Sequence, residues 1–121
     1  MNSTLLGTRV GHHIKSRAAT TIIQNNTLDD NNATTSYSID LPNGGYATIN
    51  GNTLTKSRYA ENQTFIAYGA ENGSRYGNNI LSVMNNTFRN NRSSSVGVYN
   101  HSQITATITN NVFENVSTEV V

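Results

Sequence analysis

The sequence has no cysteine, no tryptophan and a single proline among its 121 residues. The absence of cysteine excludes disulfides, thiolate metal sites and cysteine nucleophiles. Charged residues make up 12% and aromatic residues 7% of the chain, and the formal net charge is +1. Such a balance indicates neither a nucleic acid nor an anionic membrane as partner. No apolar run approaches the roughly 20 residues that a membrane span requires.

A phrase of the type Asn-Asn-Thr-Leu occurs four times. Its second asparagine falls at Asn26, Asn52, Asn86 and Asn111, which gives steps of 26 (26→52), 34 (52→86) and 25 (86→111) residues. Self-similarity at a period of about 20–50 residues is typical of solenoids, in which each repeat is one coil stacked on the next. We therefore predict a single solenoid segment over residues 1–121.

Short apolar segments at 13–16, 38–41, 65–68 and 96–99 recur between the asparagine phrases. Segments such as 47–50 and 106–109 alternate small or apolar residues with polar ones, which is typical of β-strands. No segment shows the i, i+3, i+4 apolar stripe of an amphipathic helix. The third coil is the longest because it contains a Gly/Asn-rich loop at 71–79.

The repeated asparagines predict a ladder of side-chain amides. Equivalent residues of successive parallel coils lie about 4.8 Å apart, and an amide has both donor and acceptor groups. We therefore expect Asn26, Asn52, Asn86 and Asn111 to bond to one another. Asparagine also tolerates the left-handed backbone of a tight corner, so we assign the Asn-x-Thr sequons of the repeat to fold geometry rather than glycosylation. The expected core files are Ile14, Ile39, Ile66, Val98; Ile23, Ile49, Val83, Ile108; and Leu28, Leu54, Phe88, Phe113.

Three phrases resemble bacterial right-handed parallel β-helix repeat proteins of the pectin-lyase-like superfamily. They are Gly-His-His-Ile-Lys-Ser-Arg-Ala at 11–18, Tyr-Ser-Ile-Asp-Leu-Pro-Asn-Gly-Gly at 37–45 and Ile-Ala-Tyr-Gly-Ala-Glu-Asn-Gly at 66–73. The resemblance implies an all-β fold, a right-handed parallel β-helix of about four coils with three short strands each. Relatives in that superfamily are often secreted and act on polysaccharides as lyases or hydrolases, which is an analogy at the level of the fold.

The beginning of the chain, residues 1–7, has no basic segment followed by a long apolar one, so no signal peptide is visible. We expect this chain to be an internal piece of a longer secreted or cell-surface protein. Bare solenoid ends expose strand edges to other chains. The remaining coils of the parent chain, or end-to-end self-association, are therefore the partners expected at the ends.

Charged residues concentrate on the first two coils. If the isoleucines that precede them point inward, Lys15 and Asp40 point outward side by side on adjacent coils. Arg17 lies one outward position further along coil one, and His13 lies one outward position before. Glu71 enters this face from the loop of the third coil. These residues form the candidate site.

Two interpretations of this charged face stay open. In a lyase, Lys15 or Arg17 would be the base or charge neutraliser, and Asp40 with Glu71 would hold calcium beside the sugar carboxylate. We expect no cofactor, with calcium as the alternative. Calcium takes about six to eight oxygen ligands, more than these residues supply. The alternative is an ion pair between coils that contributes less than about 1 kcal/mol.

Aromatic residues offer a second kind of site. Tyr68 and Tyr99 hold similar positions in coils three and four, where outward rings would form a platform for carbohydrate and inward rings would fill the core. His12 and His13 are adjacent on a strand and so face opposite sides, which places one of them in the interior.

Two functions follow. The first is an extracellular or cell-surface β-helix module that associates with carbohydrate without catalysis in this segment. The alternative is a polysaccharide lyase or hydrolase-like domain that acts on acidic glycans through Lys15, Arg17 and Asp40. Acidic residues are sparse, which favours the module. Ice binding through threonine rows such as 105–109 is disfavoured because the threonines are not regular across coils.

Overall fold

The computed structural model describes residues 3–9, 11–72 and 75–121, and β-strands are the only regular elements in them. The strands form three parallel sheets. Sheet A contains β1 (Thr4–Leu6), β4 (Thr27–Asp29), β7 (Thr53–Lys56), β10 (Thr87–Asn90) and β13 (Val112–Glu114). Sheet B contains β2 (Ile14–Lys15), β5 (Ile39–Leu41), β8 (Thr64–Tyr68), β11 (Val96–Asn100) and β14 (Thr118–Val120). Sheet C contains β3 (Thr20–Gln24), β6 (Tyr46–Asn50), β9 (Ile80–Met84) and β12 (Thr107–Thr109).

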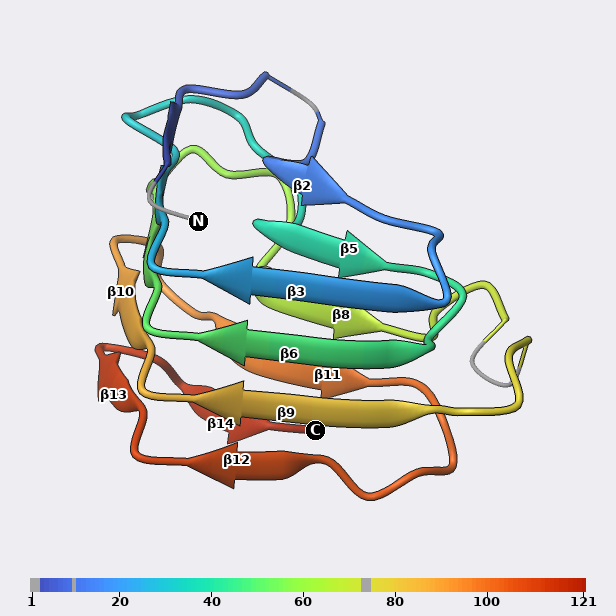
Figure 1. The fold of residues 1–121 in the computed structure, drawn as a ribbon. Coiled ribbons are helices and arrows are strands. Elements are labelled where there is room, and N and C mark those ends of the chain that lie inside the picture. Colours follow the sequence, from blue (N-terminus) through green and yellow to red (C-terminus); the bar gives the residue numbers. More distant parts are fainter. Residues whose placement is uncertain (1–2, 10, 73–74) are drawn as a thin grey trace.

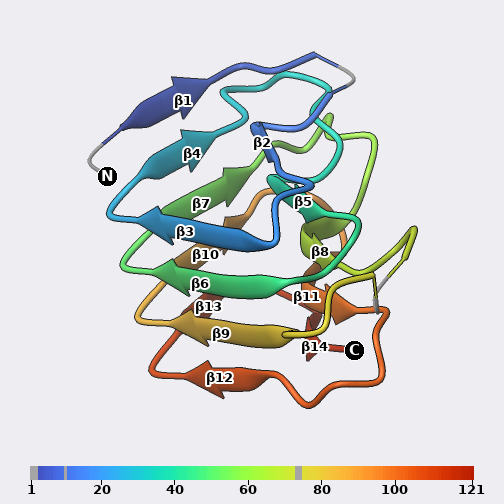
Figure 2. The same ribbon diagram turned by 45° about the vertical axis from the view of Figure 1, so that its right-hand side comes forward.

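The chain visits the three sheets in turn, so each complete coil gives one strand to each sheet, and the last coil adds β13 to sheet A and β14 to sheet B. In Figure 1 the chain descends as it runs leftward along sheet C in front, backward through sheet A and rightward along sheet B behind, and Figure 2 shows the same winding from another side. This is a right-handed parallel β-helix, the handedness that parallel crossovers favour. The predicted fold class is confirmed. Within the described residues, no helix is long and apolar enough to cross a bilayer.

The predicted core files are present in the strand register. Leu28 pairs with Leu54 and Leu54 with Phe88 in sheet A, and the isoleucine files of sheets B and C stack in the same way. The Phe88 ring stacks on Phe113 with centroids 4.7 Å apart. Residues in the middle of each file are fully buried, whereas Leu5, Ile14, Ile108 and Phe113 at the file ends are partly buried. Burial of this narrow apolar column drives the stacking of the coils.

The asparagine ladder is also confirmed. The Asn52 backbone N–H and side-chain Nδ2 both donate to Asn86 Oδ1, at 2.9 and 3.0 Å. Asn26 bonds to Asn52 in the same way, and Asn86 to Asn111. The amide of Asn52 also donates to the backbone oxygen of Ile23 at 3.0 Å. Each rung therefore satisfies side-chain and backbone groups at the buried corner between sheets C and A.

The residue before each ladder asparagine forms the corner itself. Asn25, Asn85 and Asn110 have φ of 55°, 58° and 55°, and Gly51 takes the same position with φ of 73°. A Cβ atom on Gly51 would lie 2.4 Å from Asn25 Oδ1. The left-handed backbone explains why asparagine or glycine stands at these corners, and it accounts for the sequons of the repeat as predicted.

A further copy of the repeat at the start of the chain escaped the sequence analysis. Thr4 and Leu5 pair with Thr27 and Leu28, and the backbone N–H of Ser3 donates to Asn26 Oδ1 at 3.0 Å. Ser3-Thr4-Leu5 therefore stands where Asn-Thr-Leu stands in later coils. Serine in the ladder position made this copy hard to recognise.

The long loop of the third coil folds back over the second coil. The backbone N–H groups of Glu71 and Asn72 both donate to the Pro42 oxygen, at 3.0 and 2.9 Å. At the other end of the loop, Asn79 Oδ1 accepts from the Gly45 backbone N–H at 2.9 Å. The insertion thereby carries Glu71 to the outward side of sheet B.

Candidate functional site

The predicted charged residues come together on the outward side of sheet B. Lys15 on β2 is the register partner of Asp40 on β5. The Lys15 ammonium lies 3.5 Å from Asp40 Oδ2 and 3.8 Å from Glu71 Oε2. One cation is therefore held between two carboxylates that come from different coils.

Arg17 joins the same cluster from the end of coil one. Its Nη2 donates to both carboxylate oxygens of Glu71, at 3.1 and 3.0 Å, and its Nη1 donates to Asn43 Oδ1 at 3.1 Å. The Tyr76 hydroxyl donates to the Arg17 backbone oxygen. The Arg17 and Glu71 side chains are about half exposed, so this pair contributes less than about 1 kcal/mol. It positions the loop rather than stabilising the fold.

Asp40 is more deeply buried than a surface ion pair implies. The residue is only 3% exposed, and its Oδ1 has no hydrogen-bond partner among the described residues. A buried carboxylate oxygen without a partner is costly. The positive charge of Lys15 offsets part of that cost through Oδ2.

His12, rather than His13, faces this cluster. The His12 ring stacks on Tyr37 with centroids 5.2 Å apart, and the Tyr37 backbone N–H donates to His12 Nδ1 at 3.1 Å. That contact assigns the proton of the neutral ring to Nε2, which lies 3.4 Å from Asp40 Oδ2. Burial lowers the pKa of His12, and Asp40 opposes this effect. The prediction for His13 was wrong because β2 contains only Ile14 and Lys15, so the strand alternation does not extend back to it.

The calcium role has no support in this geometry. The Lys15 ammonium contacts both Asp40 and Glu71, the two carboxylates that calcium would use. The described part of the chain holds no group of three or more His, Cys, Asp or Glu residues that could bind a metal. Lys15 and Arg17 are brought together as predicted, but each is engaged by a carboxylate. Their catalytic role stays a prediction.

The two candidate tyrosines do not occupy equivalent positions. Tyr99 is the register partner of Ala67, and Tyr68 pairs with Leu41 and Asn100. This offset of one residue places the two rings on opposite faces of sheet B. Tyr68 is fully buried, its hydroxyl donates to the Gly45 oxygen, and burial raises its pKa. The ring of Tyr68 therefore fills the core and presents no surface to a sugar.

Tyr99 points outward, as a binding residue requires. Its ring stacks on His101 with centroids 3.9 Å apart and an angle of 4° between the planes. One face of the tyrosine is thus covered by the imidazole. The carbohydrate-binding role of Tyr99 is left as a prediction.

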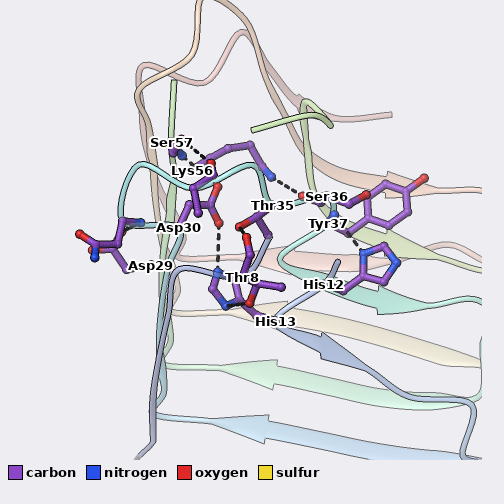
Figure 3. A network of polar contacts seen from close by, with 12 residues as sticks. Thr8, His12, His13, Asp29, Asp30, Thr35, Ser36, Tyr37, Lys56 and Ser57 are labelled. Atoms are coloured by element: carbon purple, nitrogen blue, oxygen red, sulfur yellow. Dashed lines mark hydrogen bonds and ion pairs between the residues drawn. The ribbon is translucent and has the colours of Figure 1, made fainter. Parts of the chain in front are cut away.

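A buried polar network lies at the corner between sheets A and B, and the sequence analysis missed it (Figure 3). His13 Nε2 lies 3.0 Å from Asp30 Oδ1, and both side chains are fully buried. Thr8 Oγ1 lies 3.1 Å from His13 Nδ1, and the Ser57 backbone N–H donates to Asp30 Oδ2 at 2.9 Å. The two carboxylate oxygens of Asp30 thus have partners from two different coils.

Lys56 is the second charged group of this corner, and it is fully buried. Its Nζ donates to the Ser36 backbone oxygen at 2.7 Å and lies 5.4 Å from the Phe65 ring centroid. Burial lowers the pKa of Lys56 to about 8, and Asp30 opposes this effect. One polar residue stands four positions after each ladder asparagine, at Asp30, Lys56, Asn90 and Asn115. This recurrence could have indicated the network from the sequence.

The outward face of sheet C has a different character. Its residues are Thr20, Ile22, Gln24, Tyr46, Thr48, Asn50, Ile80, Ser82, Met84, Thr107 and Thr109. None of them is charged. They form files along the solenoid axis, such as Ile22, Thr48, Ser82 and Thr107. Tyr46, the first residue of β6, is 37% exposed in the file of Thr20 and Ile80 at the edge of this face.

We compared the chain with known families, proteins and structures. No protein-family model, curated protein or solved structure matches the chain. The fold and the asparagine ladder define the chain as a parallel β-helix solenoid. They are compatible with the resemblance to the pectin-lyase-like superfamily, which rests on the three sequence phrases.

Proposed function

We propose that the chain is a carbohydrate-associated β-helix module of an extracellular or cell-surface protein, and that it binds glycans without converting them. The uncharged outward face of sheet C is the observation that supports this function. It joins hydroxyl and amide side chains to an exposed ring at Tyr46 on parallel strands. The extracellular location is part of this proposal, and the sequence resemblance to secreted β-helix proteins supports it.

The chemistry of this face matches a neutral polysaccharide. Sugar hydroxyls both donate and accept hydrogen bonds, as do the threonine, serine, asparagine and glutamine side chains of sheet C. The Tyr46 ring offers an apolar surface with a polar tip to the C–H side of a sugar. No ionic group needs to lose its water on binding. Because neighbouring coils lie about 4.8 Å apart, an extended glycan lying along the axis can reach hydroxyl groups on successive coils, such as those of Thr48, Ser82 and Thr107.

Replacing Tyr46 by alanine is expected to weaken retention on neutral polysaccharides about tenfold, since an aromatic contact contributes roughly 1 kcal/mol or somewhat more. Binding isotherms on insoluble cellulose, chitin and mannan measure the effect. Tyr59→Ala is the matched control, because Tyr59 is 51% exposed but lies outside sheet C. If the native chain is retained on none of these glycans, or if both variants lose affinity equally, the proposal fails.

A lyase that acts on acidic glycans is the second candidate, and the convergence of Lys15, Arg17 and Asp40 favours it. Such an enzyme removes a proton beside the sugar carboxylate, expels the glycosidic oxygen and leaves an unsaturated sugar. Here Asp40 and Glu71 hold both cations, which disfavours a free base. The same samples, incubated with polygalacturonate or alginate with and without calcium, decide the matter. An unsaturated product that disappears in Lys15→Ala would establish the lyase and contradict the non-catalytic module.

A further inference from the structure

A polar hollow of about 600 Å³ lies between the first two turns from sheet A to sheet B. It is lined by Gly7, Arg9, Asn31, Asn32, Ala33 and Thr34. Its size falls within the range of about 300–1,000 Å³ that is usual for small-ligand sites. The hollow is separate from the charged cluster of sheet B and from the face of sheet C, since it shares no residue with either.

Arg9 differs from the other cations of the chain. No hydrogen bond, ion pair or ring contact joins its side chain to another described residue. Seven of the eight lysines and arginines have such a partner, namely Lys15, Arg17, Lys56, Arg58, Arg75, Arg89 and Arg92. The guanidinium of Arg9 is therefore available to an anion from outside the chain.

The two carboxylates that precede Asn31 in the chain, those of Asp29 and Asp30, are not part of the lining. Asp29 Oδ1 accepts from the Asn31 backbone N–H at 2.8 Å. Asp30 is fully buried and bonds to His13 and to the Ser57 backbone N–H. The lining of the hollow thus combines one positive charge with no negative charge, and its remaining side chains are amides, a hydroxyl and a methyl group.

We propose that this hollow binds an acidic sugar, with its carboxylate on Arg9 and its hydroxyls on Asn31, Asn32 and Thr34. The planar guanidinium presents two parallel N–H groups that match the two oxygens of a carboxylate. Amide and hydroxyl side chains offer both donors and acceptors to sugar hydroxyls. The choice of a sugar as ligand rests on the proposed function. The hollow would bind an acidic sugar, whereas the face of sheet C would bind neutral ones.

The test is a titration of the full chain with digalacturonate, followed by amide chemical shifts in NMR. Galactobiose serves as the neutral counterpart and sodium sulfate as the anion alone. Digalacturonate is expected to shift the amides of residues 31–34, with an affinity that falls as salt is added. Arg9→Gln is expected to weaken this binding at least tenfold. Arg58→Gln is expected to leave it unchanged, because Arg58 is exposed and stacks on the Tyr59 ring instead.

The proposal would be overturned by shifts that lie away from residues 31–34, by unchanged affinity in Arg9→Gln, or by equal shifts with sulfate, which would show an unspecific anion site. Galactobiose binding as tight as digalacturonate would also exclude the role of the carboxylate. The neutral-glycan experiment fails or succeeds separately, because Tyr46 is not part of the lining. The chain can therefore bind cellulose through Tyr46 while the hollow binds no digalacturonate, or bind digalacturonate in the hollow while it is not retained on cellulose.

Discussion

Replacing Asn52 by alanine is expected to lower the free energy of unfolding by about 4 kcal/mol. Its Oδ1 accepts from the backbone N–H and the Nδ2 of Asn26, and its Nδ2 donates to the Ile23 oxygen and to Asn86 Oδ1. Asn52 is only 1% exposed, so water does not replace these bonds. Each buried polar group left without a partner costs about 1–3 kcal/mol, and at least two backbone groups lose theirs.

Urea unfolding followed by far-UV circular dichroism measures this loss. Thr55→Ala is the matched control, because Thr55 lies on the same strand, β7, and is half-buried on its outward side. A surface change of this kind is expected to alter the stability by about 0.5 kcal/mol or less. Similar losses in the two variants would mean that the amide ladder does not hold the coils together.

The stability of the native chain is expected to rise by roughly 3 kcal/mol between pH 8 and pH 10.5. Lys56 has a pKa of about 8 in the folded chain against 10.5 in the unfolded one, because burial disfavours the ammonium. In that window the unfolded state binds more protons, so the free energy of unfolding increases with pH. Each unit of difference in pKa corresponds to about 1.36 kcal/mol. The stabilisation is fully present above pH 10.5 and is lost as the pH falls through 8.

The comparison with Lys56→Met isolates this effect. Methionine has a similar length and no charge, so Lys56→Met is expected to lack the increase in stability between pH 8 and pH 10.5. The control Lys15→Met, which replaces an exposed lysine, is expected to retain it. The pKa of Tyr68 is raised, so its contribution is lost above about pH 10. This opposing contribution of Tyr68 is the same in the native chain, Lys56→Met and Lys15→Met, so it cancels when their stabilities are subtracted from one another. Parallel pH profiles of native chain and Lys56→Met, measured by urea unfolding, would show that the buried lysine is not the cause.

The repeat carried most of the information about the fold. The recurrence of one phrase at Asn26, Asn52, Asn86 and Asn111 predicted the ladder, because stacking of coils makes equivalent positions into neighbours even where one coil is longer. The same argument placed Lys15 beside Asp40. It succeeded because a parallel register follows directly from the repeat and needs no knowledge of loops.

The errors arose where the repeat is irregular. Tyr68 and Tyr99 were treated as equivalent although the register is offset by one residue, and such an offset exchanges the inward and outward faces. His13 was placed outward although it precedes the two-residue strand β2. The burial of Asp40, which is only 3% exposed, was also unforeseen, although Glu71 was expected on the same face. Short strands and long insertions are set by tertiary packing, which a local pattern does not contain.

The sites differ in how far the sequence could reveal them. The uncharged face of sheet C combines alternate residues from four strands, so it becomes visible only once the register is known. The hollow at Arg9 depends on two loops that are separated by more than twenty residues in the chain. Neighbours at equivalent positions of successive coils, such as Lys15 and Asp40, can be predicted from a sequence, whereas surfaces assembled from loops and whole strands require the structure.

Nuclear Overhauser contacts between methyl groups test the stacking of the coils most directly. In protein labelled at Ile, Leu and Val methyls, the account predicts contacts between register partners one coil apart, such as Ile23 with Ile49 and Leu28 with Leu54. It predicts none between Ile23 and Val83, which are two coils and about 10 Å apart. Contacts that skip a coil, or an absence of contacts between the register partners, would contradict the parallel β-helix on which the ladder and both proposed sites depend.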